Sequence, residues 1–236
     1  MLQKTEQFDA VTDAIEAIAN GEFVIVVDDT ERENEGDLII AAEKMTTEKM
    51  AFLVRHSSGL VCVAMQAQRL RALDLPQMVT HNADPFRTAF TVSVDYKYGT
   101  TSGISAADRA LTLRALADPA SQASDFHRPG HIFPLRARVG GVLERPGHTE
   151  AARDLAAMAG LQPVGVLCEI VNDDGSMARR PDLFKFAKQH GLKMITIADM
   201  IAYREHALAV AYPHAHAGPS VRQQCHLLDA AMVYGS

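Results

Sequence analysis

The sequence contains no tryptophan, and aromatic residues account for only 6% of its 236 positions, so aliphatic side chains must form most of the core. Its three cysteines, at positions 62, 168 and 225, lie too far apart for a C-x-x-C pair, and an odd number does not suggest a disulfide framework. Cys62 and Cys168 lie in apolar runs, and we expect both to be small buried residues in a reducing compartment. No stretch approaches the ~20 consecutive apolar residues of a membrane span.

Positive charge is also scarce, because 23 Lys and Arg face 29 Asp and Glu, which gives a formal net charge of −6. A chain this acidic is a poor general binder of nucleic acid or of anionic membrane surfaces, so we expect neither as a partner. The first ten residues lack the apolar core of a signal peptide, and this pattern favours a cytoplasmic protein.

Hydrophobic periodicity predicts helices and strands that alternate along the chain. Residues 131–137 contain a proline, so we predict that this segment is an edge strand or an extended loop. The pattern favours one α+β (α/β-like) domain, a mixed β-sheet flanked by helices, over residues 1–212, with a flexible tail at 213–236. Strands are predicted at 23–27, 38–42, 60–65, 90–94, 164–171 and 194–197, and helices at 8–18, 46–55, 68–73, 105–117, 149–160, 181–191 and 199–212.

A charged loop between the first two predicted strands is the strongest chemical signal. It contains one base, Arg32, and six acids: Asp28, Asp29, Glu31, Glu33, Glu35 and Asp37. A run of charge is usually a solvated surface loop. Carboxylates this close together nevertheless repel one another and need a counter-cation, and hard oxygen ligands suit Mg²⁺ or Mn²⁺. Both readings stay open on chemistry alone.

Three further sites carry chemistry. Arg145, His148 and Thr149 lie in a Gly/Pro loop before a helix, which is either a phosphate seat or a plain cap by Thr149. Glu169 ends an apolar strand, where a charge is costly unless it is used or held in a structural ion pair. His131 follows another R-P-G sequence.

Six segments together resemble the 3,4-dihydroxy-2-butanone 4-phosphate synthase family. They are DDTERENEGDLIIAAEKMT, HSSGLVC, GTTSGISAADRALTLRAL, RPGHIFPLRARVGGVLERPGHTEAARDLA, GVLCEIVNDDGSMAR and TIADMIAYR. The resemblance implies conversion of D-ribulose 5-phosphate to L-3,4-dihydroxy-2-butanone 4-phosphate and formate, through an enediolate, in riboflavin biosynthesis. It also implies two divalent ions per active site, Mg²⁺ or Mn²⁺, and a homodimer with active sites near the subunit interface.

The resemblance also assigns roles to residues. Glu33 and His148 match metal ligands, and His131 and Glu169 match residues essential for catalysis, which we expect to act as a pair. Cys62 and Thr101 match positions that line the pocket. The expected substrate contacts are Arg32, Glu33, Glu35, Asp37, Arg145, Pro146, Gly147, His148, Thr149 and Glu169. Pro146 replaces a residue that is often Gly in the family, which removes one backbone N–H from the phosphate seat.

Two other functions fit the residues. One is a different metal-dependent sugar-phosphate enzyme, an isomerase or aldolase that shares the enediolate step, which release of formate would distinguish. The other is a non-catalytic cation-binding or interaction module, which a metal-dependent turnover assay would exclude.

Overall fold

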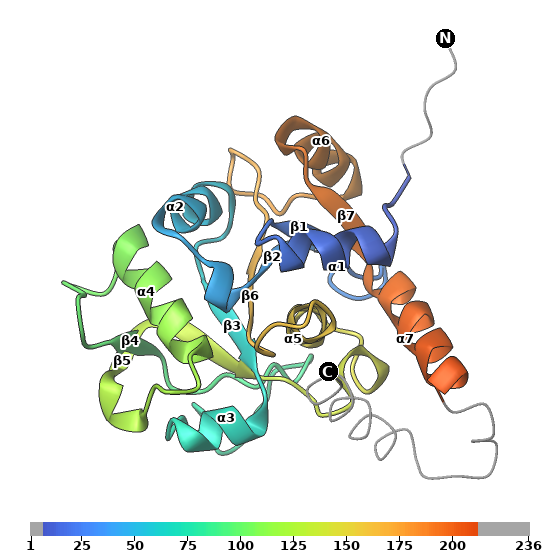
Figure 1. Ribbon diagram of the computed structural model, residues 1–236. Helices are drawn as coiled ribbons and strands as arrows, with labels where there is room; N and C mark the ends of the chain where they lie inside the picture. Colours follow the sequence, from blue (N-terminus) through green and yellow to red (C-terminus); the bar gives the residue numbers. More distant parts are fainter. Residues whose placement is uncertain (1–6, 212–236) are drawn as a thin grey trace.

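The computed structural model describes residues 7–211, which form helices packed on both faces of a central sheet (Figure 1). The strand order is β4-β5-β3-β6-β2-β1-β7. The β1–β7 and β3–β5 pairs are parallel and the others antiparallel, so the sheet is mixed and the predicted α+β fold is confirmed. The strands are β1 Val24–Val27, β2 Gly36–Ala41, β3 Cys62–Met65, β4 Val94–Tyr96, β5 Phe126–Arg136, β6 Gly165–Glu169 and β7 Lys193–Thr196.

The helices divide between the two faces of the sheet, and each face has its own aliphatic core. Side chains of α1, α5 and α7 pack with one face, and side chains of α2, α3, α4 and α6 pack with the other. Figure 1 shows α5 alongside the central strands β3 and β6. The helices are α1 Val11–Ala19, α2 Thr47–His56, α3 Ala67–Ala72, α4 Ala106–Ala117, α5 His148–Met158, α6 Arg180–His190 and α7 Ile197–Ala211. None of these helices is both long and apolar enough to cross a membrane.

Helix ends follow the local sequence closely. The Thr46 and Ser105 side chains accept hydrogen bonds from backbone N–H groups in the first turns of α2 and α4, as their sequences predict. Gly191 ends α6 in the left-handed conformation, with φ 66°. The alternative of a plain cap by Thr149 is wrong, because α5 begins at His148 and Gly147 occupies the N-cap position.

The prediction of an edge strand at 131–137 is also wrong. Strand β5 lies between β4 and β3, where Val63 pairs with Pro134. The missing N–H of Pro134 falls on the side facing residues 89–92, and there the Pro134 carbonyl accepts a hydrogen bond from the Thr91 N–H. Because that neighbouring segment makes only isolated bridges, the proline interrupts no continuous ladder. The strand predicted at 90–94 is also shorter and later than expected. Phe90 and Thr91 form only isolated bridges, and the continuous strand β4 begins at Val94.

Two features of the sheet bring acidic side chains together at one of its ends. The acidic loop joins β1 to β2, and β2 pairs antiparallel with β6 so that Asp37 lies directly opposite Glu169. Two carboxylates from distant parts of the sequence therefore meet beside the N-terminus of α5. The assignment of residues 1–212 as one domain stays a prediction, and the tail predicted at 213–236 lies outside the described residues.

Candidate active site

The acidic loop is folded around the carboxylate of Asp28. One oxygen of Asp28 accepts the Glu35 N–H at 2.9 Å, and the other accepts the Glu33 N–H at 3.0 Å and Arg32 Nη1 at 2.9 Å. Asp28 is only 2% exposed, so these bonds form in a protected setting. The loop turns at Asn34, which has a positive φ of 53° that asparagine tolerates better than most residues. Asp28 thus shapes the loop that presents Glu33.

Two arginines at the N-terminus of α6, the N-cap residue Arg179 and the first helical residue Arg180, hold this loop against the sheet. Arg179 donates to the carbonyl of Glu33 at 2.8 Å and to the carbonyl of Asn34. Arg180 donates to the carbonyl of Asp28 at 3.2 Å. The loop therefore obtains some of its positive charge from side chains about 150 positions away, which the local sequence did not reveal.

His148 brings α5 to the loop through both of its ring nitrogens. Nε2 lies 3.2 Å from the carbonyl of Val26, which can only accept, so Nε2 carries a proton. In the neutral ring Nδ1 is then the bare nitrogen, and it lies 3.5 Å from Glu33 Oε2 and 3.8 Å from Asp37 Oδ1. A backbone carbonyl that fixes the tautomer in this way is the usual support of a metal-binding histidine.

The electrostatics of this cluster favour a positive charge at its centre. Burial alone would lower the pKa of His148, but the facing carboxylates of Asp37, Glu33 and Asp28 outweigh it and raise the pKa to about 9. Burial raises the pKa of Asp37 to about 8. Asp37 Oδ1 is buried and has no hydrogen-bond partner among residues 7–211. A metal cation between these groups would take the place of the imidazolium proton and satisfy this oxygen.

The donor set fits a divalent metal. Ligand atoms of Asp28, Glu33 and His148 lie within 4.8 Å of one another. The oxygens of Asp28 already accept hydrogen bonds from the loop and Glu33 Oε2 accepts Arg32 Nη1 at 2.5 Å, whereas Asp37 Oδ1 accepts none, so Asp37 offers the freest oxygen. Two carboxylates and one imidazole form a set suited to Mg²⁺ or Mn²⁺.

Glu169 is held by a serine rather than by an ion pair. Ser58 Oγ donates to Glu169 Oε2 at 2.6 Å and accepts the Leu60 N–H at 3.3 Å. The Ser58 N–H also donates to the Glu169 carbonyl at 2.8 Å. Glu169 forms no salt bridge within residues 7–211, so its alternative role as part of a structural ion pair is not supported.

Two guanidinium groups converge on the N-terminus of α5. A Cβ atom added to Gly147 would lie 2.4 Å from Arg145 Nη1 and 3.1 Å from Arg32 Nη2, so a larger residue would displace these guanidinium groups. Arg145 donates to Glu150 Oε2 at 2.6 Å and to the carbonyl of Phe86, and the Phe86 ring lies 5.0 Å from Arg32 Cζ. Two cations beside the free N–H groups of a helix form a strong anion site.

A cavity of about 90 Å³ joins the carboxylate cluster to this basic end. Its wall includes the predicted site residues Arg32, Glu33, Glu35, Asp37, Arg145, His148, Thr149 and Glu169, together with Cys62 and Thr88. Burial raises the pKa of the Cys62 thiol well above its usual range, so Cys62 lines the cavity as a neutral group. Pro146 is exposed, and neither Pro146 nor Gly147 is part of this wall.

His131 and Glu169 are not paired in the described chain. His131 Nδ1 lies 2.7 Å from Asp95 Oδ2, and His131 is not part of the cavity wall. Cys62 pairs with Phe133 of β5 on one side and with Leu167 of β6 on the other, so β3 separates the strands that carry the two residues. Thr101 also lies outside the wall and donates to Asp108 at 2.8 Å.

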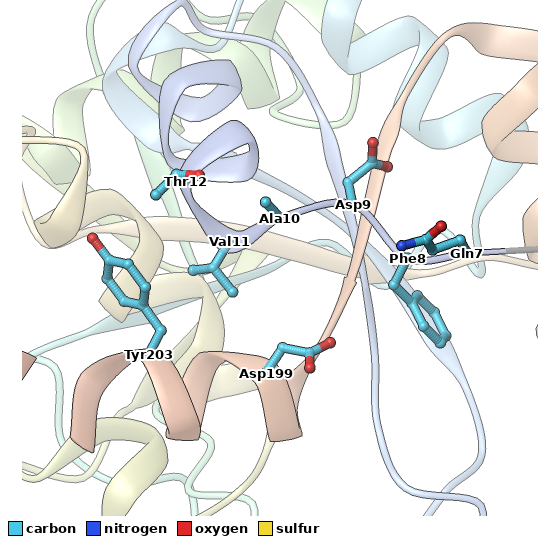
Figure 2. Close-up of a pocket in the computed structure, with 8 residues that line it drawn as sticks. All are labelled: Gln7, Phe8, Asp9, Ala10, Val11, Thr12, Asp199 and Tyr203. Atoms are coloured by element: carbon cyan, nitrogen blue, oxygen red, sulfur yellow. The ribbon is translucent and has the colours of Figure 1, made fainter. Parts of the chain in front are cut away.

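A larger hollow lies beside the start of α1 and has a volume of about 650 Å³ (Figure 2). Its lining includes the carboxylates of Asp9 and Asp199 but no basic side chain. Asp9 accepts hydrogen bonds from Lys193 Nζ and from the Met194 N–H, so the lysine already compensates its negative charge. The smaller cavity is therefore the candidate active site.

Comparison with known proteins identifies the family. The family model for 3,4-dihydroxy-2-butanone 4-phosphate synthase matches residues 12–203. The chain belongs to the 3,4-dihydroxy-2-butanone 4-phosphate synthase family. It is 60% identical over 193 residues to a 3,4-dihydroxy-2-butanone 4-phosphate synthase of Agrobacterium fabrum, an alignment that covers 82% of this chain and 91% of the relative.

Two more relatives place this synthase domain in context. A solved 3,4-dihydroxy-2-butanone 4-phosphate synthase in complex with two magnesium ions has 57% identity and a TM-score of 0.82, and the match covers 84% of this chain and 98% of the other. A probable bifunctional riboflavin biosynthesis protein of Oryza sativa, described as chloroplastic, is 61% identical over 203 residues. That alignment covers 85% of this chain but only 38% of the rice protein.

Three contacts of the synthase site were missed by sequence reasoning. Asp28 was predicted only as one of six acids in the loop. Its carboxylate in fact accepts the Glu33 and Glu35 N–H groups, a role that depends on its burial and that the sequence does not show. Ser58 lies in the motif HSSGLVC, but nothing local in that motif shows that it reaches Glu169, 111 positions away. The carbonyl of Phe86 binds Arg145 and carries no side-chain signal at all.

Proposed function

We propose that this chain converts D-ribulose 5-phosphate to L-3,4-dihydroxy-2-butanone 4-phosphate and formate, as a step of riboflavin biosynthesis. The observation that carries the proposal is the position of His148, whose Nδ1 faces Glu33 and Asp37 while its backbone begins the helix that receives Arg145 and Arg32. A carboxylate–imidazole cluster and an anion seat thereby share one small cavity. This suits a substrate with a phosphate at one end and oxygens along its carbon chain.

Glu33 and His148 are proposed as the residues that hold Mg²⁺ or Mn²⁺, with two ions in each active site. The bound ions would polarise the carbonyl and hydroxyl oxygens of the sugar and so make the neighbouring carbon acid stronger. Asp37, whose Oδ1 is unsatisfied, faces the same space as the proposed ligands.

Other groups of the protein are proposed to bind the phosphate and to transfer protons. Arg32, Arg145 and the first-turn N–H groups of His148 and Thr149 bind the phosphate and fix the orientation of the sugar. A proton must leave carbon 3 to form the enediolate, water must leave carbon 1, and carbon 4 must leave as formate. Asp37 and Glu169 lie opposite each other on β2 and β6 and are the carboxyl groups placed to exchange these protons.

The proposed homodimer reconciles His131 with this site. The His131 side chain is 41% exposed and lies outside the cavity wall of its own chain. If active sites form near the subunit interface, His131 of the partner subunit can approach the substrate that Glu169 contacts. His131 and Glu169 would then act together across the interface.

Incubation with D-ribulose 5-phosphate and Mg²⁺ tests the proposal. We expect stoichiometric formate and a four-carbon phosphate, no turnover in EDTA, and recovery when Mg²⁺ or Mn²⁺ is restored. Isomerised pentose phosphate without formate would instead support the isomerase alternative, and no turnover under any metal condition would support a binding module. The cytoplasmic location expected from the sequence stays a prediction, which fractionation of the source cells can test.

A further inference from the structure

A buried aspartate, Asp95, contacts both the backbone N–H and the ring nitrogen Nδ1 of His131. Asp95, on β4, is 7% exposed. Its Oδ1 accepts the backbone N–H of His131 at 2.8 Å, and its Oδ2 lies 2.7 Å from His131 Nδ1. In the β4–β5 ladder Val94 pairs with Ile132, and a register shift then pairs Asp95 with His127, so the Asp95 backbone is not paired with His131 although its carboxylate reaches that residue. The carboxylate is thus directed at a single residue of the neighbouring strand.

The hydrogen-bond inventory determines where the imidazole proton lies. An ionised carboxylate only accepts hydrogen bonds, so Nδ1 must be the protonated nitrogen that donates to Oδ2. In the neutral ring, Nε2 is then bare. Nε2 has no hydrogen-bond partner among residues 7–211, and 41% of the side chain is exposed. The arrangement leaves one free basic nitrogen that faces away from Asp95.

Two glycines show that the surroundings are fitted closely to this pair. A Cβ atom on Gly103, which has a φ of +90°, would lie 2.0 Å from Asp95 Oδ2 and 2.8 Å from His131 Nδ1. A Cβ atom on Gly130 would lie 2.0 Å from the Val94 carbonyl carbon. The Gly103 N–H donates to Asp108 Oδ2 at 3.0 Å, so α4 fixes the turn that covers the pair. The pair is therefore enclosed from two sides.

We propose that Asp95 is a positioning residue that holds His131 in the Nδ1–H form and presents Nε2 as a proton acceptor for the sugar phosphate. The proposal rests on the proposed function, because it assigns His131 a part in that reaction. One proton would move from the substrate to Nε2 while its bonding electrons remain on the substrate, and Asp95 would stabilise the resulting imidazolium. A purely structural Asp95 would tie β4 to β5 without any effect on which nitrogen is bare.

The first test reads the tautomer of His131 directly in the purified wild-type protein. Long-range ¹H–¹⁵N spectra, assigned with His131→Gln, are expected to show a protonated Nδ1 and a bare Nε2 at a pH where the ring is neutral. The opposite tautomer would overturn the proposal. This measurement needs no turnover and no Asp95 variant that must fold.

The second test is Asp95→Asn, which keeps the size of the side chain and removes its charge. The amide NH₂ can donate to Nδ1, so we expect the bare nitrogen to switch from Nε2 to Nδ1. We expect kcat to fall at least about 10-fold and up to about 10⁴-fold, the loss that follows when a general-base histidine takes the wrong tautomer, with little change in KM. The matched control is Asp118→Asn, in the exposed loop after α4, which should keep wild-type kcat and the wild-type tautomer.

The outcomes distinguish the role of His131 from that of Asp95. Full turnover by His131→Gln would end the proposed role of His131, whatever the tautomer. Reduced turnover by His131→Gln together with wild-type kcat in a folded Asp95→Asn protein would overturn the role of Asp95 alone.

Discussion

At the scale of single residues, His148 shows how one backbone hydrogen bond selects a metal-facing nitrogen. The Val26 carbonyl binds Nε2, and the carboxylates of Glu33 and Asp37 lie around Nδ1. The resemblance to a known family was enough to pair Glu33 with His148. It did not reveal the part played by Val26, because a carbonyl has no sequence identity and its position depends on the packing of α5 against β1.

Substitution of the proposed metal ligands should separate metal binding from phosphate binding. We expect Glu33→Gln and His148→Ala to lower kcat by orders of magnitude and to weaken Mg²⁺ binding, measured by calorimetry. Arg145→Ala should raise KM roughly 10- to 100-fold with a smaller loss of kcat, because it removes phosphate contact. Circular dichroism is the control for folding. Unchanged Mg²⁺ affinity in His148→Ala would show that His148 serves only the anion seat.

Binding of Mg²⁺ should strengthen as pH rises from 6 to 9. In the metal-free protein the facing carboxylates raise the pKa of His148 to about 9 and burial raises that of Asp37 to about 8, so the pair holds a proton between its facing atoms at pH 7. A cation must displace the proton on Nδ1, and each proton released changes the affinity about tenfold per pH unit. Calorimetry in buffers of different ionisation enthalpy measures both the affinity and the protons released. An affinity that is flat across this range would contradict the assignment.

Ser58→Ala should lower kcat about tenfold while the protein remains folded. The Ser58 hydroxyl donates to the Glu169 carboxylate at 2.6 Å, and a hydrogen bond to a charged group contributes about 1.5–3 kcal/mol. Without it the carboxylate loses its fixed orientation. The matched control is Ser124→Ala, a change of the same kind at an exposed position in the short 3-10 helix before β5. Steady-state kinetics that show equal kcat for the two variants would mean that Glu169 needs no support from Ser58.

At the scale of helices and strands, local signals located the elements, and distant contacts decided their neighbours. The caps at Thr46 and Ser105 and the end of α6 at Gly191 could be predicted because each depends on a few adjacent residues. The place of β5 could not, since a proline excludes a strand interior only where the neighbouring strand needs its N–H. The contacts of Arg179 with the acidic loop likewise depend on how α6 packs.

The N-terminus of α5 gives a direct test at this scale. Gly147→Ala should weaken substrate binding, because its Cβ would meet Arg145 Nη1 at 2.4 Å and Arg32 Nη2 at 3.1 Å. We expect KM to rise roughly tenfold, with Mg²⁺ affinity near the wild-type value. Gly160→Ala is the matched comparison, because no atom lies within 4 Å of its added Cβ and any effect there reports only its φ of +72°. Equal KM values for the two variants would argue against crowding of the arginines.

At the scale of the whole molecule, the separation of His131 from the cavity makes assembly part of the proposed mechanism. Sequence reasoning named His131 and Glu169 as a pair, but it could not show that β3 lies between their strands within one chain. The proposed homodimer makes the pair possible across an interface. The number of chains in one working unit therefore becomes a question that kinetics can answer.

Mixed dimers provide that answer. His131→Gln and Glu169→Gln should each be nearly inactive alone, and each should sediment as a dimer. Random exchange of equal amounts should restore about a quarter of wild-type activity, because half of a two-fold symmetric population is mixed and each mixed dimer carries one intact site. Two copies of the same variant, treated identically, provide the baseline. Absence of any restoration after proven exchange would require both residues to act from one chain.

The place of β6 in the sheet also governs how the chain is made. Strands β2 and β3 precede β6 in the sequence but never pair with each other, because β6 lies between them. In a nascent chain that has left the ribosome only through β3, the edges of β2 and β3 that face β6 therefore have no partner, which is a hazard for aggregation. Arrival of β6 closes both edges and brings Glu169 opposite Asp37 in the same event. Docking of β6 thus joins the two parts of the sheet and brings the two carboxylates of the proposed reactive centre together in one step, before β7 is added beside β1.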